Sequence, residues 1–179
     1  MPRILVSLIL FMTIGFSGCR LPVRETDDID GGVKTYNSGE ASPKVVESTE
    51  IVSFKCEFSL LAAVLEEESE LNGRIYTLDA ELDDGTVKCK IDCYGRESSS
   101  VPKEFTADAS FMTSLQEIVS KYDFAQHNGY ISKVSGLPHM YGAKIDIAYA
   151  SGESIYAHNN QDCFIPFEAI EELIELFNK

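Results

Sequence analysis

The sequence is poor in basic residues and lacks the short motifs by which many enzymes are recognised. Its 179 residues include 15 Lys and Arg against 29 Asp and Glu, which gives a formal net charge of -14. A surface of that sign repels nucleic acid and anionic lipid headgroups, so no nucleic-acid partner is expected. The chain also has no G-x-S-x-G, H-E-x-x-H, G-x-G-x-x-G, P-loop or EF-hand pattern. We therefore expect no enzyme, no cofactor and no metal site.

The N-terminal apolar run is too short to cross a bilayer. It extends over residues 4–16, whereas a transmembrane helix needs roughly 20 apolar residues. With Arg3 before it, the run is typical of a signal peptide, here residues 1–18. An uncleaved apolar anchor and ordinary secretion are the alternatives, although no A-x-A pattern of small residues ends the run.

The end of this run resembles the lipobox of bacterial lipoproteins. It reads Phe16-Ser17-Gly18-Cys19, with Phe16 where an aliphatic residue is usual. The resemblance implies that lipid, including palmitate, is attached to the Cys19 thiol before cleavage on its N-terminal side. More than one acyl chain makes such anchoring stable. We therefore expect a lipoprotein held through Cys19 on the extracytoplasmic face of a bacterial cell membrane.

A polar segment follows the expected anchor. Residues 20–49 are rich in Asp, Glu, Ser, Gly, Pro and Lys, and Tyr36 is their only aromatic residue. Such a composition buries too little apolar area to offset its chain entropy. We predict a flexible tether over residues 19–49, long enough to hold a domain roughly 30 Å from the membrane. A single globular domain should occupy residues 50–179.

The expected domain alternates between strand and helix patterns. Apolar and polar residues alternate from Val52 to Leu60, and hairpins are expected around Asp83-Asp84-Gly85 and Ser151-Gly152. Apolar residues recur at helical spacing over 108–123 and 167–177. Residues 61–71 fit a short helix or a wide loop equally well, and the turn-rich residues 124–142 should form a surface loop.

These patterns predict an α+β fold, with a mainly antiparallel sheet built from hairpins and one face covered by two amphipathic helices. The segment from Gly136 to Phe177, with its Gly-x-Pro loop, Ser-Gly-Glu turn and Asn-Gln-Asp stretch, resembles an uncharacterised domain of bacterial lipoproteins. That resemblance implies no activity.

Four cysteines follow Cys19. The alternation places Cys56, Cys89 and Cys93 on the apolar sides of strands, which favours a role as small core residues. On one strand Cys89 and Cys93 would be about 13 Å apart, too far to form a disulfide or to share a zinc ion. A disulfide between two strands, or between a strand and the loop at Cys163, is the alternative in an oxidising compartment.

Two polar segments are candidates for ligand binding. One directly precedes the last helix, where amides and a carboxylate could hold a cation or a polar ligand, or could satisfy backbone groups of the turn. The other is the loop over residues 127–141, whose tyrosines could serve recognition or pack over a sheet edge. The candidate residues are His158, Asn159, Asn160, Gln161, Asp162, Tyr130 and Tyr141.

An anchor, a tether and an acidic domain without a catalytic motif favour a non-catalytic binding or interaction module. Its partner, besides the membrane held through Cys19, would be a protein or a small polar ligand. The alternative is a structural or assembly component of the cell envelope, which would present a continuous apolar patch on one sheet face. An enzyme would need a histidine within hydrogen-bond reach of a carboxylate in a cleft.

Overall fold

The structure is a computed structural model that describes residues 34–60, 74–95, 98–99, 102–136 and 141–179. The expected signal peptide, Cys19, the first part of the expected tether, and residues 61–71 lie outside the described residues, as does His139. Among the described residues, no helix combines the length and the apolar character that crossing a membrane requires.

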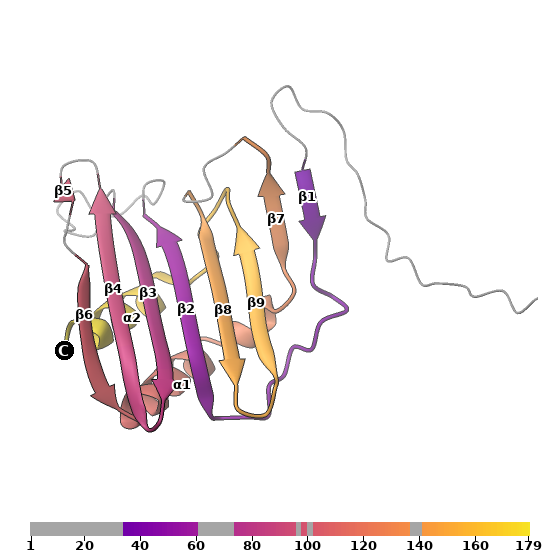
Figure 1. Ribbon diagram of the computed structural model, residues 1–179. Coiled ribbons are helices and arrows are strands. Elements are labelled where there is room, and N and C mark those ends of the chain that lie inside the picture. The colour runs from indigo at the N-terminus through magenta and orange to yellow at the C-terminus, as the bar shows by residue number, and fades with distance from the viewer. Residues whose placement is uncertain (1–33, 61–73, 96–97, 100–101, 137–140) are drawn as a thin grey trace, which may run out of the picture.

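The described chain forms one sheet of nine strands, two α-helices and one short 3-10 helix (Figure 1). The strands are β1 (Lys34–Asn37), β2 (Ile51–Ser59), β3 (Arg74–Asp83), β4 (Thr86–Gly95), β5 (Ser98–Ser99), β6 (Lys103–Asp108), β7 (Ile131–Val134), β8 (Ala143–Tyr149) and β9 (Ser154–Asn159). The helices are α1 (Ser110–Lys121), the 3-10 helix η1 (Phe124–His127) and α2 (Phe167–Asn178).

The strands follow the order β1-β7-β9-β8-β2-β3-β4-β5, and β6 pairs with the first part of β4. Every described pair is antiparallel except β7 with β9, which is parallel. The expected mixture of helices with a mainly antiparallel sheet is therefore confirmed. Hairpins alone do not build this sheet, because the central strand β2 pairs with β8 from much later in the chain.

The turn between β3 and β4 has the chemistry that a tight hairpin needs. Asp83 pairs with Thr86, so the loop contains two residues, Asp84 and Gly85. Both have positive φ, at 47° and 78°. Two consecutive residues of this kind match the right-handed twist of the flanking strands, and glycine and aspartate tolerate the conformation.

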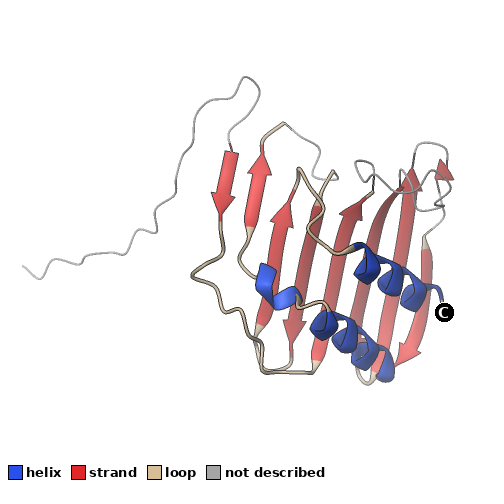
Figure 2. Ribbon diagram, turned by 180° about the vertical axis from the view of Figure 1, so that it is seen from behind, coloured by secondary structure: helices blue, strands red, loops and turns tan. Residues whose placement is uncertain are grey.

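The two α-helices lie on the same side of the sheet (Figure 2). α1 contacts β2 and β6, and α2 contacts β4, so β1 and β7 form an edge beyond the helices. The Phe177 ring of α2 packs against Phe54 of β2, Phe105 of β6 and Phe111 of α1, with ring centroids 6.3, 6.4 and 5.1 Å away. Burying these large rings is the main source of stability in such a core.

Residues 34–49, expected to be part of the tether, instead belong to the fold. β1 pairs with β7 along its whole length. The next segment, which we call the strap (residues 38–50), leads to β2, and its Lys44 Nζ donates to the carbonyl oxygens of Gln126 and Asn128 at 3.0 and 2.7 Å. Hydrogen bonds to distant backbone groups hold this segment in place. Such bonds need no regular spacing of apolar residues, so the sequence gives no local sign of them.

β7 and η1 fall in the segment that was expected to be a surface loop. β7 is four residues long, and only its first and last residues, Ile131 and Val134, are apolar. It pairs with β9 at two positions only. A strand of this length contains too few residues for alternation to distinguish it from a loop.

Candidate functional site

The polar segment 158–162 joins β9 to the edge of the sheet. The Asn160 side chain bonds both backbone groups of Val134: its Oδ1 accepts from the N–H and its Nδ2 donates to the C=O, each at 2.9 Å. Its own backbone N–H donates to the carbonyl of Ser132 at 3.1 Å. Asn160 is only 4% exposed. It therefore extends the pairing of β7 with β9 beyond the last residue of β9.

The neighbouring residues form a compact turn towards α2. Asn159 Oδ1 accepts from the backbone N–H groups of Gln161 and Asp162, at 2.9 and 3.3 Å. Gln161 Nε2 donates to the Ser132 hydroxyl at 2.9 Å. A Cβ at Gly142 would lie 1.9 Å from the Asn159 carbonyl oxygen, so only glycine fits there. Asn159 and Asn160 thus satisfy backbone groups of the turn and of β7, which is the alternative to ligand binding that the sequence offered, whereas α2 has no side-chain cap.

The two candidate tyrosines differ in their surroundings. Tyr130 is half-buried, and its ring meets Tyr36 of β1 and Phe164 edge to face, at 6.3 and 6.1 Å between centroids. Tyr141 is exposed, at 42%. Because β7 pairs with β9, the loop that contains Tyr130 and the segment that contains Asn160 meet at one edge. At this edge, Tyr130 packs against other rings and Asn160 is hydrogen-bonded to the backbone, so both side chains contribute to the fold.

The described histidines belong to the same region. The His127 ring lies 4.9 Å from the Phe164 ring, and burial, together with the Lys44 ammonium, lowers the pKa of His127. The neutral form of His127 is therefore favoured. His158 is 8% exposed and lies opposite Lys144 on one side and Ile131 on the other.

All four cysteines after Cys19 are free thiols. Cys56 and Cys89 are buried in the core, as their strand positions predicted, while Cys93 and Cys163 are half-buried. Burial raises the pKa of Cys89 and of Cys163 to about 11, so both thiols stay protonated at neutral pH. Within the described ranges, no three His, Cys, Asp or Glu side chains gather closely enough to hold a metal ion.

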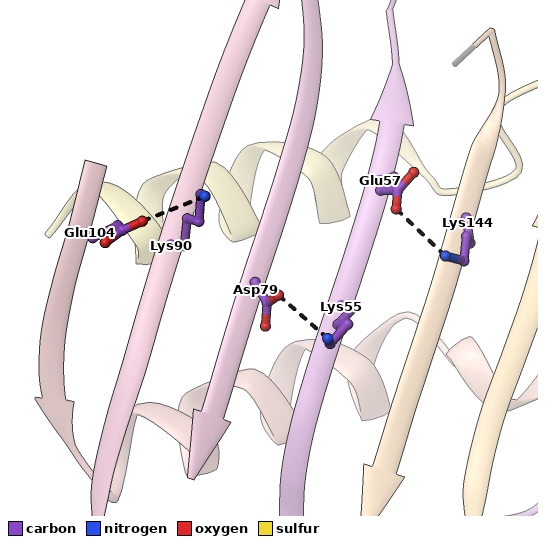
Figure 3. A network of polar contacts seen from close by, with 6 residues as sticks. All are labelled: Lys55, Glu57, Asp79, Lys90, Glu104 and Lys144. Carbon is purple, nitrogen blue, oxygen red and sulfur yellow. Dashed lines mark ion pairs between the residues drawn. The ribbon is translucent and has the colours of Figure 1, made fainter. Parts of the chain in front are cut away.

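The sheet face turned away from the helices, which we call the open face, carries a row of charges (Figure 3). Asp146, Lys55, Asp79, Lys90 and Glu104 lie directly opposite one another across β8, β2, β3, β4 and β6, and their signs alternate. Lys55 pairs with Asp79 at 3.7 Å and Lys90 with Glu104 at 3.5 Å.

Two further ion pairs lie at other positions along the strands. Lys144 Nζ lies 3.5 Å from Glu57, and Lys88 pairs with Asp83 near the hairpin turn. A hollow of about 500 Å³ lies over β3, β4 and β6 among these charges. A partner that docked here would have to remove water from charges that already neutralise one another. The open face therefore has the character of a water-facing surface.

A different kind of hollow lies beside α1. Two adjoining hollows of about 610 and 320 Å³ share Gln116 and Ser120 of α1, and we call them together the groove. The strap lines both hollows, and the second is also lined by Asp123 directly after α1 and by Tyr149 and Ile155 of the β8–β9 hairpin. The groove thus combines three separate segments of the chain.

The groove is rich in hydrogen-bond acceptors. Gln116 is half-buried: its Nε2 donates to the Ser120 hydroxyl at 2.8 Å, and its side chain also forms a hydrogen bond with Tyr149, while its Oε1 has no partner among the described residues. Glu50 and Glu117 line the first hollow and Asp123 the second. In the described part of the chain, none of these three carboxylates takes part in an ion pair.

The two lysines that line the groove are already engaged. Lys44 bonds to two backbone carbonyl groups, and Lys121 Nζ lies 2.6 Å from Glu172 of α2. The carboxylates of Glu50, Glu117 and Asp123 are therefore the groups of the groove that could accept hydrogen bonds from a ligand.

The sequence singled out none of the groove residues. Residues 38–49 of the strap were expected to belong to the tether, and Gln116 and Ser120 look like ordinary polar residues at helical spacing on α1. No protein-family model, no curated protein and no solved structure that was compared with the chain matches it.

Proposed function

We propose that this chain is a lipoprotein anchored through lipid on Cys19 to the extracytoplasmic face of a bacterial cell membrane, and that its domain is a non-catalytic binding module. The groove beside α1 is its binding site. The proposed membrane location is supported by the apolar run over residues 4–16 and by the lipobox-like Phe16-Ser17-Gly18-Cys19.

One observation carries the binding role: a concave groove beside α1 brings together residues of the strap, of α1 and of the β8–β9 hairpin. Concave sites with a few convergent polar groups are the usual form of small-molecule sites.

The alternative is a structural or assembly component of the envelope. It would use a continuous apolar patch on one sheet face. The described residues of the open face carry alternating charges instead, from Asp146 on β8 to Glu104 on β6. The groove therefore supports the binding module better.

Filling the groove tests this proposal. Ser120 is exposed and lines both hollows, so Ser120→Phe should occupy the space with little cost to folding. The full lipidated chain in nonionic detergent would be heated with sets of small polar compounds grouped by charge. A compound that binds the folded chain raises its Tm, by about 5 °C at saturating concentration.

We expect at least one group of compounds to raise the Tm of the unaltered chain and to leave that of Ser120→Phe unchanged. Glu171→Phe places the same ring on the exposed side of α2 and serves as the matched control. If no group raises the Tm, or if all three proteins respond alike, the groove is not a binding site.

A further inference from the structure

The edge of the sheet at β1 and β7 differs in charge from the rest of the domain (Figure 1). β1, β7 and β9 are neighbours at this end of the strand order, and together they contain two lysines, Lys34 and Lys133, and no Asp or Glu. Within the described ranges, neither lysine takes part in an ion pair. The acidic residue closest to β1 in the sequence is Glu40 of the strap. The edge is therefore a locally basic part of a chain whose net charge is -14.

An exposed aromatic ring lies on the same edge. Tyr36 of β1 is 45% exposed, and Lys34 Nζ lies 5.6 Å from its ring centroid. The Tyr130 ring meets Tyr36 edge to face at 6.3 Å and helps to hold it in place. Lys133 lies opposite Thr35, so it points to the other side of the sheet. The edge thus combines an amphipathic ring with an ammonium group on each side of the sheet.

This combination suits the headgroup region of a lipid bilayer. A tyrosine ring has an apolar body and a polar hydroxyl group, and such rings gather at the level of the headgroups. Lysine side chains can extend towards anionic headgroups, whose attraction acts within about one Debye length. A membrane surface that contains anionic lipid is therefore the partner whose chemistry fits the edge.

The position of the edge along the chain also favours the membrane. Cys19, the proposed site of lipid attachment, precedes Lys34 by fifteen residues, and β1 is the first described element after it. Fifteen residues span at most about 50 Å when fully extended, so β1 stays within that distance of an anchored Cys19. Because acyl chains supply the affinity, the edge needs only to be repelled less than the parts of the domain that carry carboxylates.

We infer that the β1–β7 edge rests against the bilayer that the lipid on Cys19 enters, with Tyr36 at the headgroup level and Lys34 and Lys133 beside anionic headgroups. This inference rests on the proposed anchor and adds a second contact between the protein and the membrane. The opposite edge, at β6, then points away from the membrane. Since neighbouring strands are about 4.8 Å apart, β6 lies roughly 35 Å from β1 across the sheet.

Fluorescence quenching on vesicles tests the inference. The chain contains no tryptophan, so a single introduced tryptophan reports on its own surroundings. Tyr36→Trp exchanges one aromatic ring for another at the proposed contact, and Thr106→Trp places a ring at an exposed position of β6 as the matched control. Each full lipidated chain is incorporated into vesicles of phosphatidylcholine and phosphatidylglycerol that contain phosphatidylcholine spin-labelled on its headgroup. We expect the label to quench Tyr36→Trp strongly and to leave Thr106→Trp unquenched.

Two pairs of substitutions with the same change in net charge test the role of the lysines in the Tyr36→Trp chain. Lys34→Gln with Lys133→Gln removes the ammonium groups of the edge. Lys88→Gln with Lys90→Gln removes two ammonium groups from β4 and is the matched control. Each lysine near an anionic membrane strengthens the association about fivefold. The edge pair should therefore abolish most of the quenching, whereas the β4 pair should leave it unchanged.

Flotation of the vesicles separates this inference from the proposed anchor. If the unaltered chain does not float with the vesicles, the anchor on Cys19 is wrong and the inference fails with it. If the chain floats but Tyr36→Trp is quenched no more than Thr106→Trp, the anchor stands and the edge faces outwards, where only a protein or a soluble anion could meet it. Quenching that persists after Lys34→Gln with Lys133→Gln would likewise overturn the inference.

Discussion

At the scale of single residues, the side chains that looked most ligand-like maintain the fold. Asn160 offers both a donor and an acceptor, and both are used on the backbone of Val134. An amide is the side chain that can imitate a peptide group in this way. The same property that suggested a polar ligand in the sequence makes Asn160 part of the sheet edge.

Asn160→Ala should therefore lower the free energy of unfolding by about 2 kcal/mol, because it leaves the N–H and C=O of Val134 without their partner. Gln161→Ala is the matched control, since Gln161 is exposed and makes one side-chain bond, to Ser132. It should cost about 0.5 kcal/mol. Urea unfolding measures both values, and equal shifts of the two midpoints would contradict the role given to Asn160.

At the scale of elements, the open face shows how cross-strand register orders charges. Lys55 lies between Asp79 of β3 and Asp146 of β8. Directly opposite residues of unlike charge stabilise a pair of strands modestly, and like charges destabilise it. The row therefore favours this register over a slip by one residue, which would turn the charged side chains towards the core.

Lys55→Glu should destabilise the fold by about 0.5 to 1 kcal/mol, because it sets three carboxylates in a row. Lys55→Gln removes the attraction without adding repulsion, so it should lower the free energy of unfolding by less than Lys55→Glu does. The difference between the two variants should shrink as salt is added, because Lys55 and Asp79 are partly exposed and their charges are screened. A difference in unfolding free energy that does not change with salt would show that packing, and not charge, is responsible.

At the scale of the whole molecule, the chain combines the proposed anchor with an acidic domain. If lipid on Cys19 is what holds the chain, Cys19→Ser should move the protein from the membrane fraction to the soluble extracytoplasmic fraction. Intact mass should show acyl chains on the unaltered protein and none on the variant. Cys163→Ser changes a thiol in the domain and should stay in the membrane fraction. A Cys19→Ser protein found in the membrane after its signal peptide is removed would refute the anchor.

Elements whose apolar residues recur at a regular spacing could be predicted from the sequence. β2, α1, α2 and the β3–β4 hairpin lie within a residue or two of the expected positions, because burial on one side imposes a period that is visible locally. β1, β7 and the strap could not be predicted. They are short or polar, and bonds to distant groups hold them, such as those from Lys44 to the carbonyls of Gln126 and Asn128.

The sequence by itself determined the acidic character of the chain, the alternation that buries one face of the sheet, and the two amphipathic helices. These properties depend on composition and on neighbours a few residues apart. Only the tertiary structure decided which groups the polar side chains meet: Asn160 is bonded to Val134, and Gln116 lines a groove together with residues of the strap. The physical reason is that a hydrogen-bond partner far away in the sequence leaves no local pattern.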